Sequence, residues 1–302
     1  MHRLAACSAV LALAVRAPLV AAQDAVARPL TFAEIAALSA PPADHRIAYG
    51  PDSLQFGELR LPKAKGPFPT IVLLHGGCWL SQYDLKHTGA MAAALAEEGF
   101  AVWAIEYRRL GNAGGGWPNT FHDVARGADY LRELARRYPL DTARVVLVGH
   151  SAGGQFALWL AARHNLPAAS EFATASPIRV RGVVSLAGVT DLKAFATARA
   201  EGCNSVVPRM MGGSPSETPE RYAQVSPIEL VPLGVPSRLL TGYLDRTVTM
   251  DQASAFAERA HARGDDSQRT LLEREGHFDV LSPRAPAWHH VMGAIRSLLE
   301  DY

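Results

Sequence analysis

The sequence lacks the signatures that accompany the binding of nucleic acids, metals or nucleotides. Its 302 residues include 30 Lys and Arg against 29 Asp and Glu, so the formal net charge is only +1. A nucleic-acid-binding protein normally has a basic excess and a high pI, and this chain has neither. It also has no C-x-x-C, H-E-x-x-H or P-loop motif. We therefore expect no nucleic-acid partner and no bound metal.

Long apolar runs are scarce as well, and the one candidate for a membrane segment lies at the N-terminus. A short basic start precedes 12 small and apolar residues, Leu4 to Val15. This run is too short for a bilayer, which needs about 20 residues. Small residues up to Ala22 follow, which completes the layout of a secretory signal peptide. The sequence predicts cleavage after Ala22, export to the periplasm or the cell exterior, and no stable membrane insertion. The alternative is an ordinary alanine-rich first helix.

Beyond residue 44, short apolar runs alternate with longer segments of helical period. Continuous runs rich in branched residues are typical of strands buried on both faces of a parallel sheet. Strands that alternate with helices predict an α/β fold with a mostly parallel central sheet and helices on both faces. The predicted strands are residues 70–74, 101–105, 145–148, 180–186, 237–243 and 269–273, with antiparallel additions near 49 and 55–61, and the predicted helices are residues 85–98, 121–138, 152–164, 251–263 and 287–299.

Two segments fall outside this alternation. Residues 23–44 end in two prolines and predict a loosely attached N-terminal leading segment. Residues 191–236 form a long connection with six prolines in its second part. A connection of that length inside a domain is more often a lid or a pocket wall than a bare loop. The predicted organisation is a signal peptide (1–22), a leading segment (23–44) and one α/β domain (45–302) with an inserted cap.

Residues 149–153 read Gly-His-Ser-Ala-Gly, a G-x-S-x-G motif between a predicted strand and a predicted helix. The flanking glycines let the chain turn sharply, which places a serine hydroxyl above the sheet at the helix N-terminus. The isolated motif is common by chance, but the strand–motif–helix context is much rarer. Ser151 is therefore the candidate nucleophile, and the alternative is a tight turn with an ordinary serine.

A serine is a weak nucleophile unless a base takes its proton and a third group orients that base. In a sheet of this kind the partners are expected later in the chain, the acid before the histidine, each after a strand. His277 follows the last predicted strand and is the candidate base. Asp245 follows the strand before it and is the candidate acid. The alternatives are a capping or turn role for Asp245, with Asp191 as the acid.

Residues 75–79 read His-Gly-Gly-Cys-Trp, directly after the predicted strand at 70–74. Glycine lets backbone N–H groups face a developing oxyanion without obstruction by a side chain. The N–H of Ala152, which follows the candidate nucleophile, would point at the same place. The sequence thus predicts a loop that stabilises a tetrahedral intermediate, with His75 in a structural role.

Taken in order, these motifs resemble the α/β-hydrolase superfamily. More narrowly, they resemble its esterase branch with an H-G-G-x-W loop, which includes arylformamidase (kynurenine formamidase)-like and carboxylesterase-like enzymes. The resemblance spans about residues 45–302 and implies an α/β-hydrolase fold. The roles it implies are nucleophile for Ser151, general base for His277, orienting acid for Asp245, and oxyanion-hole donors for the N–H groups of Gly77, Cys78 and Ala152.

Cys78 stands where the lipase-type H-G-G-G loop has glycine. This departure leaves Gly76 and Gly77 as an alternative pair of oxyanion donors. Without the signal peptide, Cys78 and Cys203 are the two cysteines of the chain. Because export places them in an oxidising compartment, we predict a disulfide that joins the oxyanion loop to the 191–236 segment.

Three large side chains are candidates for the wall of a substrate pocket. Trp79, Trp117 and Met210 are predicted to line an acyl or aromatic pocket near the nucleophile. Filling of the core is an equally good interpretation of the same residues.

The sequence therefore predicts an exported serine hydrolase that cleaves a small-molecule carboxylic ester through an acyl-enzyme. This chemistry needs no metal and no organic cofactor. The alternative within enzymes is a C–N hydrolase, either formamidase-like or a small peptidase. The alternative from another class is an inactive hydrolase fold that serves as a binding module. The retention of all three triad candidates argues against this alternative, because binding alone needs none of them. The acyl group, the alcohol and the oligomeric state are not indicated by the sequence.

Overall fold

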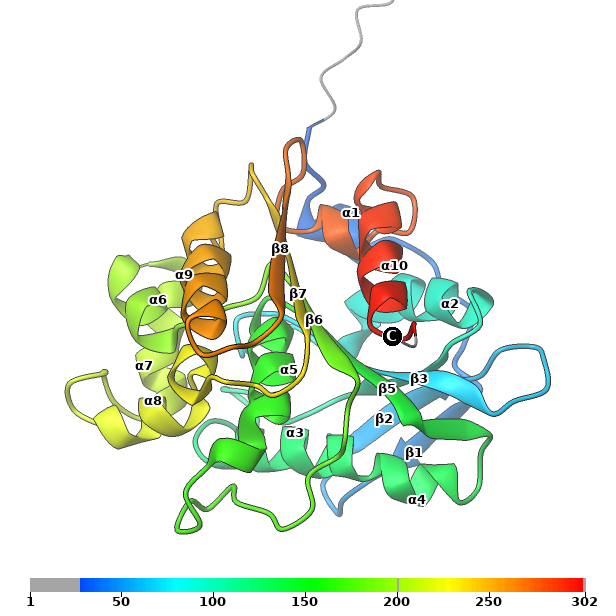
Figure 1. The fold of residues 1–302 in the computed structure, drawn as a ribbon, viewed down its shortest axis with the longest axis horizontal. Coiled ribbons are helices and arrows are strands. Elements are labelled where there is room, and N and C mark those ends of the chain that lie inside the picture. Colours follow the sequence, from blue (N-terminus) through cyan, green and yellow to red (C-terminus); the bar gives the residue numbers. More distant parts are fainter. Residues whose placement is uncertain (1–27, 200, 301–302) are drawn as a thin grey trace, which may run out of the picture.

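Eight strands form one sheet in the computed structural model, which describes residues 28–199 and 201–300 (Figure 1). The strand order is β1-β2-β4-β3-β5-β6-β7-β8. β2 is antiparallel to β1 and to β4, and the other neighbouring pairs are parallel. The strands are β1 (His45–Ala48), β2 (Phe56–Arg60), β3 (Phe68–Leu74), β4 (Ala101–Ile105), β5 (Leu140–His150), β6 (Gly182–Leu186), β7 (Ser237–Gly242) and β8 (Ser267–Leu272).

The central strands are buried on both faces, which explains their continuous apolar sequences. Ile71 and Leu73 of β3 belong to one core cluster, whereas Val72 and Leu74 belong to another. Successive residues of a strand point to opposite faces, so the two clusters lie on opposite sides of the sheet. The predicted α/β architecture with a mostly parallel, doubly covered sheet is confirmed.

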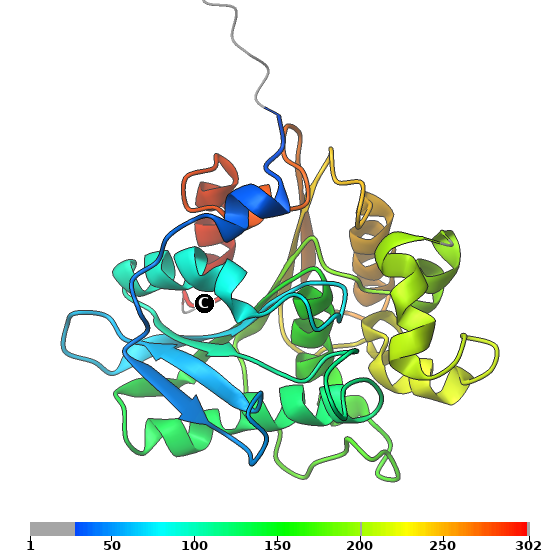
Figure 2. The same cartoon turned by 180° about the vertical axis from the view of Figure 1, so that it is seen from behind.

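Helices cover both faces of the sheet (Figures 1 and 2). One core cluster includes residues of α2 and α10, and the other includes residues of α3, α4, α5 and α9. The predicted helix over 121–138 is two helices that meet at Tyr130. The covering helices are α2 (Gly89–Glu97), α3 (Asn119–Asp129), α4 (Leu131–Ala135), α5 (Ala152–Ala162), α9 (Met250–His261) and α10 (Ala287–Ser297), with short 3-10 helices η1 (Leu85–Thr88), η2 (Arg163–Asn165) and η5 (Asp279–Leu281).

The long segment after β6 is helical rather than irregular. It contains α6 (Leu192–Ala198), η3 (Gly202–Ser205), α7 (Val206–Met211), α8 (Pro219–Val225) and η4 (Pro227–Leu230). These helices lie beside α9, on the side of the molecule away from α2 and α10 (Figures 1 and 2). The described part of this segment is therefore a helical insertion between β6 and β7, which we call the cap.

The N-terminal leading segment is only partly described. The predicted signal peptide, residues 1–22, lies outside the described residues, so its prediction stands as made. Residues 28–44 include α1 (Phe32–Ala36), and Ile35 of this helix is 1% exposed in the core beside α2 and α10. The expected loose attachment is therefore wrong for this part, because an apolar side chain anchors it.

Candidate active site

Ser151 lies on the sharp turn between β5 and α5. Its backbone has φ 54° and ψ −118°, a strained conformation for a residue with a side chain. A Cβ at Gly149 would overlap the carbonyl of Gly153, and one at Gly153 would overlap the carbonyl of Leu74. The turn therefore requires both glycines of the motif. The strand–motif–helix context predicted for Ser151 is confirmed.

His277 and Asp245 meet in the structure. The Nδ1 of His277 donates to Oδ2 of Asp245 at 2.7 Å, and both side chains are buried. The other oxygen, Oδ1, accepts from the backbone N–H groups of Thr247 at 2.7 Å and Val248 at 2.9 Å. Asp245 thus has both the turn role and the contact with His277. This contact holds the Nδ1 proton in place and leaves Nε2 as the available nitrogen.

Asp191, the alternative acid, has a different role. Its side chain accepts from the N–H of Ala194 at 3.0 Å and caps α6. An aspartate before the first turn of a helix commonly has this role. The structure brings Asp245, and not Asp191, to His277.

Ser151 and His277 line one cavity of about 190 Å³. Gly77 and Cys78 of residues 75–79, the predicted oxyanion loop, line it as well. A larger hollow of about 600 Å³ lies near α3 and is lined by Arg108, Asp123 and Arg126 among others. That hollow contains none of the triad candidates, so the smaller cavity is the candidate active site.

The predicted oxyanion loop has an unusual backbone. Gly77, Cys78 and Trp79 all have positive φ, at 115°, 52° and 58°. Within residues 28–199 and 201–300, the N–H groups of Gly77, Cys78 and Ala152 donate to no protein acceptor. Gly76 is packed against His150 and Ser151 and is not among the residues that line the cavity. This geometry favours the amides of Gly77 and Cys78 over those of Gly76 and Gly77.

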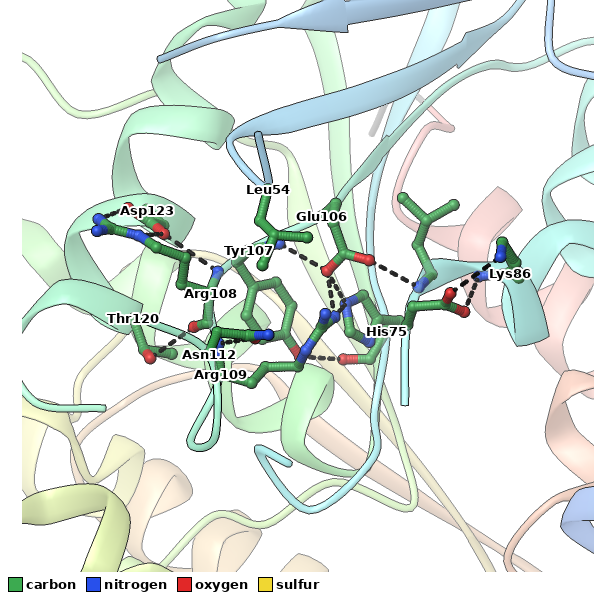
Figure 3. Close-up of polar contacts among 12 residues, drawn as sticks. Leu54, His75, Lys86, Glu106, Tyr107, Arg108, Arg109, Asn112, Thr120 and Asp123 are labelled. Carbon is green, nitrogen blue, oxygen red and sulfur yellow. Dashed lines mark hydrogen bonds and ion pairs between the residues drawn. The ribbon is translucent and has the colours of Figure 1, made fainter. Parts of the chain in front are cut away.

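A buried polar network around His75 fixes the start of the predicted oxyanion loop (Figure 3). His75 stacks on Tyr107 with ring centroids 4.3 Å apart, and the Tyr107 hydroxyl donates to the His75 carbonyl at 2.7 Å. Glu106 accepts from the N–H groups of Tyr107 and Leu85 and lies 3.0 Å from His75 Nε2. The Arg109 guanidinium forms an ion pair with the same carboxylate.

Glu106 remains ionised in this network despite its burial. Burial by itself raises its pKa, but the nearby His75 and Arg109 and the N–H of Tyr107 together lower that pKa to about 2. Sequence reasoning missed Glu106, Tyr107 and Arg109. The available signal was their position directly after a buried strand, at the sheet edge where the candidate nucleophile lies.

The predicted disulfide is present. Cys78 is bonded to Cys203, 125 positions further along the sequence, with their Cα atoms 5.1 Å apart. Both residues line the cavity. The disulfide therefore joins the predicted oxyanion loop directly to the cap.

The predicted pocket residues need a correction. Trp79 and Met210 are 1% and 0% exposed, belong to the core, and are not among the residues that line the cavity. Trp117 packs edge-on against Phe121 and Phe172 at the margin of the same core and does not line the cavity either. The aromatic lining comes instead from Phe32, Tyr83 and Phe278. Large apolar residues in a sequence do not distinguish a pocket wall from core filling.

Two buried histidines near the site are held neutral. Burial, assisted by His75, lowers the pKa of His87 to about 4. Burial, assisted by His277, lowers the pKa of His150 well below its ordinary value. The Nε2 of His150 lies 2.9 Å from the His277 carbonyl, so this ring also holds the His277 loop.

We expect the His87 pKa to make folding stability depend on pH. The unfolded chain protonates this residue near pH 6.5 and the folded chain near pH 4, so stability present above 6.5 is lost as the pH falls between these values. The loss from His87 alone should be roughly 2 kcal/mol between pH 7 and pH 5. Denaturant unfolding at both pH values measures it. His87→Gln should flatten the dependence, whereas exposed His261→Gln should not. Equal slopes for wild type and His87→Gln would contradict the assignment.

The described part of the chain shows no grouping of three or more His, Cys, Asp or Glu side chains suited to a metal ion. No helix among those residues is long and apolar enough to cross a bilayer.

A mostly parallel sheet with a serine on a strand-to-helix turn and an Asp–His pair after later strands defines an α/β-hydrolase fold. A solved structure of esterase B from Lactobacillus rhamnosis matches 88% of this chain and 91% of its own, with a TM-score of 0.74 and 19% identity. At this identity the likeness establishes the fold. The resemblance to the α/β-hydrolase superfamily is confirmed, while the arylformamidase-like subtype stays a prediction.

The chain belongs to the BD-FAE family, whose sequence model matches residues 58–260, about two thirds of the chain. It is 35% identical over 101 residues to neutral cholesterol ester hydrolase 1 of Pongo abelii, covering 32% of this chain and 24% of that protein. It is 25% identical over 196 residues to the probable carboxylic ester hydrolase LipM of Mycobacterium tuberculosis, covering 64% and 45%. The matched regions thus span less than half the length of these relatives.

Proposed function

We propose that this protein is a serine hydrolase that cleaves carboxylic esters through a Ser151–His277–Asp245 triad. The observation that carries the proposal is one cavity lined by both Ser151 and His277, with Asp245 bonded to the Nδ1 of that histidine. The similarity to two proteins named as ester hydrolases supports the same chemistry. The substrate is proposed to be a small molecule, since the cavity is only about 190 Å³.

The first half of the reaction transfers the acyl group to the enzyme. Ser151 Oγ attacks the ester carbonyl carbon while Nε2 of His277 takes the hydroxyl proton. Asp245 stabilises the resulting imidazolium through the Nδ1 hydrogen bond. When the tetrahedral intermediate collapses, the ester C–O bond breaks and the alcohol leaves with the proton from His277. Water then attacks the acyl-enzyme with the same proton transfers through His277, which releases the acid and restores the Ser151 hydroxyl.

The negative charge of each tetrahedral intermediate needs donors that are already in place. We assign this role to the N–H groups of Gly77, Cys78 and Ala152, which have no protein acceptor among the described residues. Donors that are fixed before the reaction stabilise developing charge without reorganisation. The Glu106 network and the disulfide both hold the loop that carries two of these amides.

A panel of substrates tests this function and separates the alternatives. Matched pairs that share an acyl group, such as 4-nitrophenyl butyrate and butyryl 4-nitroanilide, should give much faster hydrolysis of the ester. Faster cleavage of the anilide or of an N-formyl amide would support the C–N hydrolase alternative. Binding without turnover of either would support the inactive binding module and contradict the proposed function.

We also propose export of the protein across the membrane. The proposal is supported by the signal-peptide layout of residues 1–22 and by a disulfide, since disulfides persist in oxidising compartments. N-terminal sequencing of protein recovered outside the cytoplasm should begin at Gln23. Recovery from the cytoplasm alone, with Met1 retained, would contradict export.

Loss of the disulfide should affect both stability and turnover. Cys203→Ser should lower the free energy of unfolding by about 3–5 kcal/mol, because the bond closes a long loop. It should also lower kcat about tenfold, because a misplaced donor group weakens transition-state stabilisation. Chemical denaturation and steady-state kinetics measure the two effects. Reductant should reproduce them in wild type and have no further effect on Cys203→Ser. Unchanged kinetics in reduced wild type would contradict a role for the bond at the oxyanion loop.

A further inference from the structure

The short helix α1 is fixed against the loop that carries His277. Its N-terminus has a capping box, in which Thr31 and Glu34 exchange hydrogen bonds between side chains and backbone N–H groups. Just before it, the N–H of Leu30 donates to Oδ1 of Asp279 at 3.1 Å, while Oδ2 of the same carboxylate accepts from Gly276 at 2.7 Å. One buried carboxylate therefore ties the leading segment to the residue before His277.

Phe32, the first residue of α1, is at the centre of a ring cluster beside the candidate nucleophile. Its ring centroid lies 5.0 Å from that of Tyr83, 5.5 Å from that of His87 and 5.8 Å from that of Phe278. All three contacts are edge-on, which is a preferred geometry for aromatic pairs. The four residues line the cavity that also contains Ser151 and His277. Phe32 is thus a wall of that cavity, although it lies 119 positions before Ser151 in the sequence.

The cavity is small for a substrate site. Its volume of about 190 Å³ is the space of roughly six water molecules, below the 300–1,000 Å³ common for ligand pockets. The other walls offer little room for adjustment. Cys78 and Cys203 are joined covalently, and His150 and His277 are held by hydrogen bonds. Phe32 is the aromatic wall that comes from the short helix α1, which precedes the first strand of the sheet.

We propose that α1 completes the substrate cavity and that Phe32 limits the length of the ester group that binds there. The inference rests on the proposed hydrolysis at Ser151 and adds the substrate class: esters whose cavity-bound part is a short chain. Because Phe32 touches the bound group and not the reacting atoms, it sets specificity rather than chemistry.

The test is a chain-length profile of kcat/KM. One series varies the acyl chain of 4-nitrophenyl esters from acetate to octanoate, and a second varies the alcohol of acetate esters over the same lengths. Phe32→Ala should raise the ratio of long-chain to short-chain kcat/KM about tenfold or more in at least one series, since methylene groups in an apolar pocket change specificity by such factors. Phe32→Trp should move the same ratio in the opposite direction.

The controls separate specificity from general damage. Phe172→Ala removes a more deeply buried ring, one from the cluster around Phe121 and Trp159 that does not line the cavity, so it should leave both profiles unchanged. Phe32→Leu replaces Phe32→Ala if the smaller side chain prevents folding, as judged by thermal melting. A uniform loss of activity at all chain lengths, or an unchanged ratio in both Phe32 variants, would overturn the role proposed for Phe32. Neither result would contradict the proposed function, provided that the wild type hydrolyses esters. A wild type that hydrolyses no ester would instead overturn the proposed function together with this inference.

Discussion

Replacing Ser151 with alanine is expected to lower kcat for ester hydrolysis on the order of 10⁵-fold, with the fold intact. The nucleophile is lost, but the backbone of the turn keeps its hydrogen bonds, including the one from the Ser151 N–H to the Leu186 carbonyl at 2.9 Å. Alanine also fits the same space as serine. Steady-state kinetics measure the loss, and near-ultraviolet circular dichroism with thermal melting checks the fold.

The same reasoning predicts how the triad residues combine. His277→Ala should reduce kcat by a comparable factor, and the double variant with Ser151→Ala should be little worse than either single variant. When groups act in one proton transfer, removal of any one of them abolishes the catalytic contribution of all of them. Additive losses in the double variant would indicate that the two side chains act independently, which would contradict the proposed mechanism.

The second large effect is expected at the acid. Asp245→Asn should lower kcat about 10⁴-fold, because an amide can still satisfy the turn N–H groups of Thr247 and Val248 through its oxygen. Its NH₂ group would then face His277 Nδ1 and move the imidazole proton to Nε2. That tautomer cannot accept the proton of Ser151. The pH–rate profile and kcat of the variant measure the effect.

Asp191→Asn is the matched control for this experiment. Asparagine caps a helix about as well as aspartate, so the hydrogen bond to the Ala194 N–H is retained. Activity should stay within about twofold of wild type. A larger loss from Asp191→Asn than from Asp245→Asn would reverse the assignment of the acid.

The fold was largely predictable because its signals are local. Continuous apolar runs such as residues 101–105 identified strands buried on both faces, and the strands pair as a parallel sheet requires. The details that were missed have no local signal in the sequence. No periodicity in the sequence reveals the break between α3 and α4 at Tyr130. The cap helices contribute to the same core cluster as α5 and α9, a tertiary arrangement that their own sequences do not reveal.

The triad residues of the candidate site were predictable because the order of the strands along the chain constrains where they lie. Ser151, Asp245 and His277 each follow a strand, and parallel strands bring such positions to one edge of the sheet. The walls of the cavity have no such constraint. Trp79 looked suited to a pocket and is core, whereas Phe32 reaches the cavity from a segment expected to be loosely attached. Only a tertiary contact, such as that of Leu30 with Asp279, decides where such residues lie.

Reaction with a fluorophosphonate, followed by mass spectrometry of the proteolysed protein, tests the central claim most directly. The reagent reacts with an activated serine next to a general base, so the adduct should form on Ser151 alone. It should be absent in Ser151→Ala and much slower in His277→Ala. Undiminished ester hydrolysis by Ser151→Ala, or an adduct on another residue with Ser151 unmodified, would contradict the proposal that Ser151 is an activated nucleophile.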